Sequence, residues 1–287
     1  MLRHQLPSYF RRSRRESDDS DYSEYLSICG FVKDERYLLE WVEYHRLVGV
    51  QKIYLYDDSV IPAQSILSRQ IQEGFVEVVL ARTGISQENA YAHFLKNLAH
   101  HSRWVAFIDA DEFLVPITSD DVKTILRDYE SYGGLAVSWL TFGSSHYITR
   151  PTGLETVNYL RRSKSNYDLN KHVKVIVQTA HTVAPAGNPH AFVYRFKYYC
   201  VNEKKRLVLG PYSENSHDLI QLNHYYLRSY SDFKEKILRG LTGVNRWDFR
   251  GWPIERFFKV DIHSNDVYDA RILRFVPRLN ERLDQLH

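Results

Sequence analysis

The sequence has only two cysteines, Cys29 and Cys200, among 287 residues, and each lies in an apolar or aromatic run. Two thiols cannot form a disulfide framework, and buried free cysteines are common in reducing compartments. Long apolar runs are also lacking: no stretch approaches the roughly 20 residues of a membrane span, and the N-terminus lacks a signal-peptide core. These absences favour a cytoplasmic protein that is soluble or peripheral on the inner face of a membrane.

A dominant charge is missing as well. The 38 basic and 35 acidic residues give a formal net charge of +3, which is too balanced for a dedicated nucleic-acid binder. Residues 1–23 carry a basic and then an acidic cluster with little to bury, which is typical of a disordered tail. The basic cluster can contact an anionic membrane surface, although only weakly without an amphipathic helix. The clusters are Arg11, Arg12, Arg14 and Arg15, then Asp18, Asp19 and Asp21.

From Tyr25 onward, apolar runs alternate with segments of helical spacing. We expect strands at 26–32, 52–57, 75–80 and 104–108 and helices at 35–48, 61–73 and 87–101. This alternation predicts an α/β fold with a mostly parallel, twisted sheet and helices on both faces. The second half is less regular, with strands expected at 136–142, 173–177, 191–199 and 219–226 and a helix at 231–239. The amphipathic end, 269–286, should be kinked or divided at Pro277.

Polar side chains follow three of the expected strands, at the edge where α/β sheets bind ligands. Asp109 and Asp111 come directly after the nearly all-apolar fourth strand, so their carboxylates can turn toward one point. Such oxygen ligands suit Mg²⁺ or Mn²⁺, which complete their coordination with phosphate oxygens and water. A polar strand end or a helix cap is the structural alternative. The three segments are Lys33-Asp34-Glu35, Asp57-Asp58-Ser59 and Asp109-Ala110-Asp111-Glu112.

An ordered series of blocks over about residues 25–240 resembles the glycosyltransferase family 2-like and family 92 group. The blocks are Ile28–Glu35, Leu39–Gly49, Ile53–Ser59, Ile108–Phe113, Trp139 with Phe142–Ser145, Lys174–Val177, His190, Asn223–Tyr225 and Phe233–Gly240. The resemblance implies a GT-A fold over 24–250, followed by a helical extension at 251–287. It implies a nucleotide-sugar donor, with a UDP-sugar favoured, a divalent Mn²⁺ or Mg²⁺ ion, and a glycan or other hydroxyl acceptor. Hexosyl transfer with inversion, in a polysaccharide or surface-glycan pathway, is the expected reaction.

The resemblance also implies roles for single residues. Asp111 is the expected main metal ligand, Asp109 contacts the metal or the donor ribose, and His224 is a third ligand unless it is hydrogen-bonded core. The other expectations follow the order of the substrate. Nucleotide-pocket residues are Lys33, Glu35, Asp57 and Asp58; diphosphate contacts are Lys174, Arg228 and Arg239; sugar-pocket residues are Trp139, Phe142, Gly143 and His146. Capping, surface ion pairs and core packing are the alternatives for these side chains.

The general base is the weakest part of the resemblance, because no segment matches the Glu-Asp base motif typical of family 2. Asp232, at the start of the helix at 231–239, is the nominal choice, with Glu214, Asp218 and Asp248 behind it. Two other functions stay open. A nucleotidyltransferase should carry a glycine-rich basic loop after its first strand, and the sequence there is Val-Lys-Asp-Glu. A non-catalytic carbohydrate-binding or scaffold protein would not need the acidic cluster.

Overall fold

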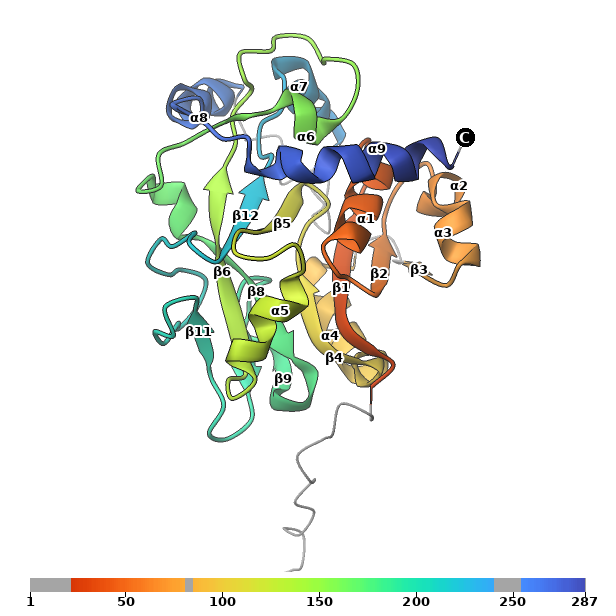
Figure 1. The fold of residues 1–287 in the computed structure, drawn as a ribbon, viewed down its shortest axis with the longest axis vertical. Helices are drawn as coiled ribbons and strands as arrows, with labels where there is room; N and C mark the ends of the chain where they lie inside the picture. Colours follow the sequence, from red (N-terminus) through yellow and green to blue (C-terminus); the bar gives the residue numbers. More distant parts are fainter. Residues whose placement is uncertain (1–21, 81–84, 240–253, 287) are drawn as a thin grey trace, which may run out of the picture.

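A computed structural model describes residues 22–80, 85–239 and 254–286 (Figure 1). Within these ranges the main sheet has nine strands, in the order β3-β2-β1-β4-β8-β6-β12-β5, with β11 beside β6. The first half of the chain supplies four mutually parallel strands, as predicted. They are β1 (Glu24–Val32), β2 (Lys52–Asp57), β3 (Val76–Leu80) and β4 (Ser102–Phe107).

The second half extends this sheet with strands of both directions. β8 (Val173–Gln178) lies antiparallel between β4 and β6 (Gly134–Thr141), and β12 (Ile220–His224) runs parallel to β6. β5 (Glu112–Pro116) closes the edge antiparallel to β12, and β11 (Cys200–Asn202) adds to β6. Five of these eight pairings are parallel. The predicted α/β, GT-A type sheet is therefore confirmed.

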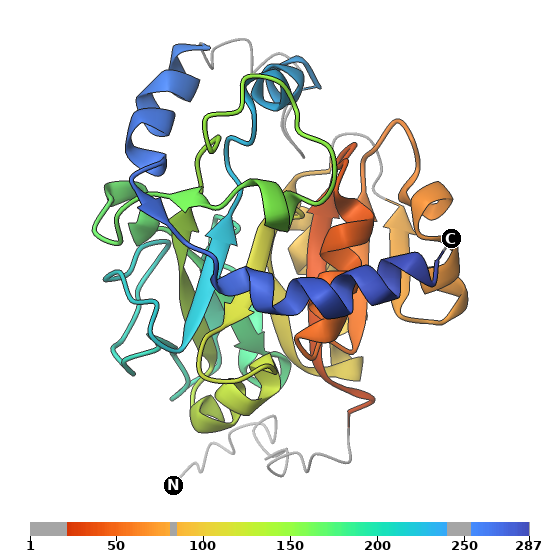
Figure 2. The same ribbon diagram turned by 45° about the horizontal axis from the view of Figure 1, so that its top comes forward.

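Both faces of the sheet are covered, because successive strand side chains point to opposite sides. On β1, Ile28 and Val32 join one hydrophobic cluster, and Cys29 and Phe31 join another. The first cluster lies under α1 (Leu38–Leu47), α5 (Val122–Leu126) and α9 (Val276–Asp284). The second lies under α4 (Gln87–Asn97). Figure 2 shows α9 running across the face that carries α1.

The other predicted elements are mostly present, with local differences. The helix expected at 61–73 breaks at Leu67 into α2 (Ala63–Ile66) and α3 (Ser68–Gln72). The strand expected at 191–199 is reduced to β10 (Phe192–Tyr194), paired with β9 (Thr182–Pro185). The amphipathic end is divided as predicted, because Pro277 lies in the first turn of α9, where no backbone N–H is needed.

Further short elements surround the carboxyl ends of the strands (Figure 1). They include α6 (Glu155–Asn158), α7 (Tyr230–Arg239), α8 (Glu255–Ser264) and the pair β7 (Arg161–Arg162) with β13 (Val267–Tyr268). No helix of the described ranges is long and apolar enough to cross a membrane. The basic cluster of the N-terminal tail and Asp248 lie outside the described residues.

Candidate active site

The acidic segment forms a tight turn between β4 and β5. The N–H of Glu112 donates to the carbonyl of Asp109 at 3.0 Å, and the N–H of Asp109 donates to the Glu112 carboxylate at 2.8 Å. The register of β5 with β12 places Glu112 opposite His224, and the N–H of Tyr225 donates to the carbonyl of Asp111 at 2.9 Å. The turn is thus fixed at the sheet edge that the sequence predicts for ligand binding.

Asp111 lies among positive and polar groups. Its Oδ2 accepts a hydrogen bond from Lys236 Nζ at 2.8 Å, and its Oδ1 is 3.7 Å from His224 Nε2. Burial alone would raise the pKa of Asp111, but Lys236, His224 and Arg228 outweigh burial and hold this pKa well below its usual range. Asp111 is therefore ionised, and the structure brings it together with the predicted ligand His224.

Asp109 points to a different cation. Its Oδ2 accepts from Lys174 Nζ at 2.8 Å, and its Oδ1 accepts from Gln87 Nε2 at 2.5 Å. Lys174 is 1% exposed and also lies 3.7 Å from the Glu112 carboxylate. Its burial would lower the pKa of Lys174, but Asp109 and Glu112 raise it, so the lysine stays charged. Lys174 was predicted to neutralise the diphosphate, and in the structure it holds the acidic turn from beneath.

Glu112 is fully buried, and its Oε1 has no partner among the described residues. Burial raises the pKa of Glu112 well above its ordinary value. The side chain therefore favours its neutral form and serves to brace the turn.

A cavity of about 350 Å³ opens beside the acidic turn, and we name it the turn cavity. Its wall includes Trp139, whose ring stacks on His172 at 4.8 Å and lies 4.3 Å from the ring of His224 and 5.5 Å from that of His190. Burial lowers the pKa of His224 to about 3 and that of His190 to about 4, so both are neutral near pH 7. Trp139 Nε1 and His224 Nδ1 are buried without a partner in the described part of the chain.

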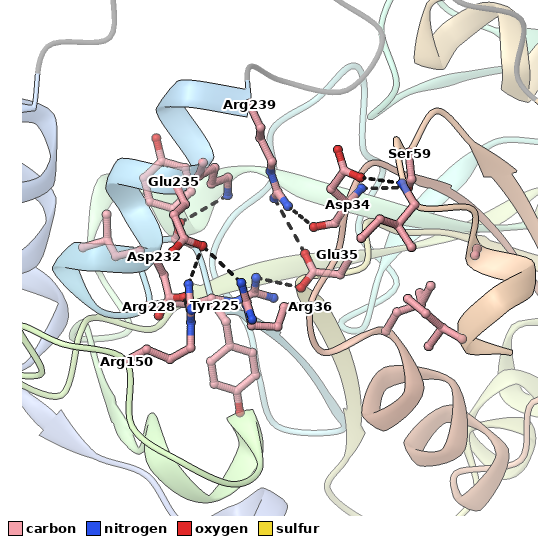
Figure 3. A pocket seen from close by; sticks show the side chains of 17 residues that line it. Asp34, Glu35, Arg36, Ser59, Arg150, Tyr225, Arg228, Asp232, Glu235 and Arg239 are labelled. Carbon is pink, nitrogen blue, oxygen red and sulfur yellow. Dashed lines mark hydrogen bonds and ion pairs between the residues drawn. The ribbon is translucent and has the colours of Figure 1, made fainter.

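A second cavity, of about 450 Å³, adjoins the first, and we name it the arginine cavity (Figure 3). Figure 3 shows Arg36 and Arg150 directed at Glu235, with Arg239 on the side of Asp34 and Glu35. The two cavities share four lining residues: Glu35, Tyr226, Lys236 and Arg239.

The nucleotide-pocket predictions have mixed placements. Lys33 and Glu35 line the turn cavity, and Glu35 forms an ion pair with Arg228 at 2.8 Å. Asp57 lines neither cavity, because its carboxylate accepts from the N–H groups of Ser59 and Ala63 and so fixes the start of α2. Asp58 also lines neither cavity and lies 3.5 Å from Lys33 Nζ.

Arg239 lines both cavities. Its Nη1 donates to the carbonyl of Asp34 at 2.5 Å, and its Nη2 lies 3.8 Å from the Glu35 carboxylate. Arg228 is held more firmly, because its guanidinium pairs with Glu155 as well as with Glu35. Arg239 is thus the guanidinium with more unused donors at the shared wall.

Asp232, the nominal base, lines the arginine cavity but is already engaged. Its Oδ1 accepts from Arg150, and its Oδ2 accepts from Ser229 and from the Tyr159 hydroxyl. Although burial opposes it, hydrogen bonds from Ser229 and Arg150 lower the pKa of Asp232. These contacts make it a weak proton acceptor.

Three of the four predicted sugar-pocket residues line neither cavity, and only Trp139 does. Phe142 is buried against the ring of Tyr225, at 5.0 Å between centroids. A Cβ on Gly143 would lie 2.5 Å from the carbonyl oxygen of Ser264, so this glycine admits the end of α8. His146 is exposed, with a φ of 68°.

The sequence prediction missed several cavity residues. Gln87, His172 and Lys236 come from three distant segments and meet only in the folded chain. The one available signal was for Lys236, which lies one helical turn after Asp232 on a helix that was itself predicted.

A divalent ion fits this site only in part. No three His, Cys, Asp or Glu side chains of the described ranges gather closely enough to hold a metal ion. Asp111 Oδ1 and His224 Nε2 are 3.7 Å apart, close to the roughly 3 Å that separates two ligands of one such ion. Together they would form a two-ligand site, which Mg²⁺ and Mn²⁺ complete with phosphate oxygens and water. The ammonium group of Lys236 already contacts the other Asp111 oxygen.

Comparison with known proteins adds to this geometry. A glycosyltransferase family 92 protein of Ricinus communis is 26% identical over 239 residues, covering 77% of this chain and 39% of the relative. A family 92 protein of Oryza sativa subsp. japonica is 25% identical over 249 residues, covering 84% and 39%. The chain thus spans 39% of the length of these curated relatives.

Among solved structures, residues 1–349 of TarS from S. aureus align at 11% identity with a TM-score of 0.41, over 78% of this chain and 68% of that one. A TM-score this low supports no conclusion about donor or reaction. The sequence itself is more informative, because residues 25–242 match the profile of glycosyltransferase family 92. Since that match covers well over half of the 287 residues, the chain belongs to glycosyltransferase family 92.

Proposed function

We propose that the protein transfers a sugar, a hexose by expectation, from a nucleoside diphosphate sugar to a hydroxyl of a glycan or similar acceptor. The observation that carries this proposal is the placement of Asp111. It is an ionised carboxylate at a sheet edge, beside a neutral histidine and at the wall of a cavity of about 350 Å³. A cavity of this size suits a small ligand such as a nucleotide sugar.

The lining of the turn cavity suggests how a donor lies in it. The nucleoside, uridine in our proposal, lies toward Lys33 and Glu35 at the end of β1, where a carboxylate can accept hydrogen bonds. The diphosphate lies near Asp111 and the shared wall, where Arg239 provides positive charge. The sugar then faces Trp139, since indole faces pack on the apolar C–H faces of sugars.

We further propose that a divalent ion, Mn²⁺ or Mg²⁺, binds with the donor. Asp111 and His224 would hold it, and its charge would stabilise the departing nucleoside diphosphate. His224 suits this task because it is neutral near pH 7 and keeps a lone pair for coordination. Asp109 is less suited, because both of its oxygens are occupied by Lys174 and Gln87.

We place the acceptor in the arginine cavity, because it meets the donor site at a common wall. In an inverting transfer the acceptor hydroxyl attacks in one displacement and gives its proton to a base. Asp232 remains our nominal base. Glu235 lies one turn further along α7, is 54% exposed and therefore competes for this role.

The test is Asp111→Ala, with Asp128→Ala as an exposed control that lines neither cavity. Each variant is incubated with a panel of UDP- and GDP-sugars, Mn²⁺ and glycan acceptors, and released nucleoside diphosphate is measured. We expect Asp111→Ala to lose at least about 100-fold in turnover, typical of removing a group that stabilises transition-state charge. Its circular dichroism and the activity of Asp128→Ala should be unchanged.

Full turnover in Asp111→Ala would refute the assignment of this site. Chelation with EDTA should abolish turnover, and added Mn²⁺ should restore it, if the ion takes part. Release of pyrophosphate in place of nucleoside diphosphate would instead indicate a nucleotidyltransferase. Glycan binding without nucleotide release would indicate a carbohydrate-binding protein.

A further inference from the structure

Lys236 occupies the one place at the site where both cavities and the acidic turn meet. It projects from α7, lines both cavities, and is 18% exposed. Its Nζ lies 2.8 Å from Asp111 Oδ2 and 3.3 Å from the carbonyl oxygen of Tyr226. In the protein without ligands, Lys236 therefore supplies the positive charge that Asp111 requires.

We propose that Lys236 is a positioning residue that changes partner when the donor binds. It pairs with Asp111 in the ligand-free protein and with the donor diphosphate when the donor and its cation are present. This inference rests on the proposed function, because it concerns the same cation and the same donor.

The exchange follows from simple electrostatics. A divalent ion at Asp111 and an ammonium group 2.8 Å from the same carboxylate repel each other, so the ion binds only if the lysine withdraws. The incoming diphosphate brings negative charge next to the shared wall. A lysine is a compact charge on a flexible stem, so it can leave the carboxylate for a phosphate oxygen without moving the helix.

Lys174 is a useful contrast, because it cannot make the same exchange. It is 1% exposed, lines neither cavity and lies between Asp109 and Glu112. Its withdrawal would leave two buried acids without a counter-charge, at a cost of several kcal/mol. Of the two lysines on the acidic turn, only Lys236 combines a carboxylate partner with open space on both sides.

The proposal predicts effects of opposite sign from one substitution. In Lys236→Met the competitor for Asp111 is gone, so Mn²⁺ alone should bind at least about fivefold more tightly than to the unmodified protein. The phosphate partner is gone too, so UDP in saturating Mn²⁺ should bind at least about fivefold more weakly. A purely structural role for Lys236 would weaken both.

The experiment measures Mn²⁺ binding by electron paramagnetic resonance and UDP binding by calorimetry in the full chain. Lys236→Arg keeps a cation and should stay within about threefold of the unmodified protein in both measurements. Lys234→Met is the matched control, because this exposed lysine on the same helix contacts only the ring of Tyr230 among the described residues, and it should change neither constant. Circular dichroism confirms that each variant is folded.

Weaker or unchanged Mn²⁺ binding in Lys236→Met would overturn the partner exchange. So would UDP binding to the unmodified protein that is strong without Mn²⁺ and lost in Lys236→Met, because the lysine would then replace the ion. The proposed function fails in a distinguishable way: the unmodified protein would then bind neither Mn²⁺ nor UDP, and both proposals would fall.

Discussion

At the scale of single residues, neighbouring positions of one segment have quite different tasks. Trp139 and Gly143 are four residues apart, yet Trp139 lines the turn cavity and Gly143 receives the end of α8. The predicted sugar-pocket role of Gly143 relied on its ability to admit a close backbone approach. That reasoning holds, but the approaching group is the carbonyl of Ser264 and no ligand is required to explain it.

We therefore expect Gly143→Ala to affect stability more than catalysis. Its Cβ would lie 2.5 Å from the Ser264 oxygen and 2.7 Å from Asn265 Oδ1, so α8 must shift. The expected loss is about 1–3 kcal/mol in the free energy of unfolding, with turnover per folded molecule unchanged. Urea unfolding and single-substrate kinetics check this, with the exposed His146→Ala as control. A large fall in turnover at unchanged stability would restore a direct role at the sugar.

The same scale shows what the sequence could predict about the site. Asp109 and Asp111 were predicted because they follow a buried strand, and strand ends are set by local pattern. Their separate lysine partners could not be predicted, since Lys174 and Lys236 lie 65 and 125 residues away along the chain. Which charge meets which depends on sheet order, and sheet order is a property of the whole fold.

At the scale of elements, one buried arginine joins three of them. Arg228 precedes α7, and its guanidinium pairs with Glu155 at the start of α6 and with Glu35 in the turn before α1. Burial would lower the pKa of Arg228, but the two carboxylates raise it well above its usual value. The shared wall of the two cavities therefore rests on a fully desolvated ion network.

Arg228→Met should be strongly destabilising, because it leaves Glu155 buried without a counter-charge. We expect a loss of about 3–5 kcal/mol in the free energy of unfolding. The double variant Arg228→Met with Glu155→Gln should recover part of this loss, since the uncompensated charge is then absent. Thermal and urea denaturation of both variants provide the measurement. Equal stability of the single and double variants would show that the pair is not coupled.

Strands and helices of the first half were predicted well because each repeats a simple pattern of burial. β5 was not foreseen, because Glu112–Pro116 directly follows the acidic turn and resembles a continuation of the preceding strand. Its pairing with β12, more than 100 residues later, is a tertiary contact that no local pattern signals. The irregular second half has the same cause, with short strands paired over long distances.

At the scale of the whole molecule, buried histidines link stability to pH. His45 is fully buried: its Nδ1–H donates to the carbonyl of Trp41 at 2.8 Å, and its Nε2 accepts from the N–H of Leu114 at 3.3 Å. Both contacts require the neutral ring, and burial lowers the pKa of His45 to about 3. In the unfolded chain the same ring has a pKa near 6.5. Below that value the unfolded state gains a proton that the folded state refuses, so stability falls with pH.

We expect His45→Gln to remove this pH dependence. Relative to the variant, the unmodified protein should lose about 2 kcal/mol of unfolding free energy between pH 7 and pH 5. Urea denaturation at several pH values gives the difference curve, in which the contributions of other groups cancel. A flat difference curve would mean that His45 accepts a proton in the folded protein.

The family match ends at residue 242, but the structural body does not. Phe275, just before α9, lies against Tyr44 of α1 at 5.6 Å between ring centroids, and Arg282 binds Glu43 at 2.6 Å. An expression fragment cut at the family boundary would strip this cover from α1 and present its aromatic side to water. Such a fragment would be prone to aggregate, and its inactivity would say nothing about the chemistry of the missing residues.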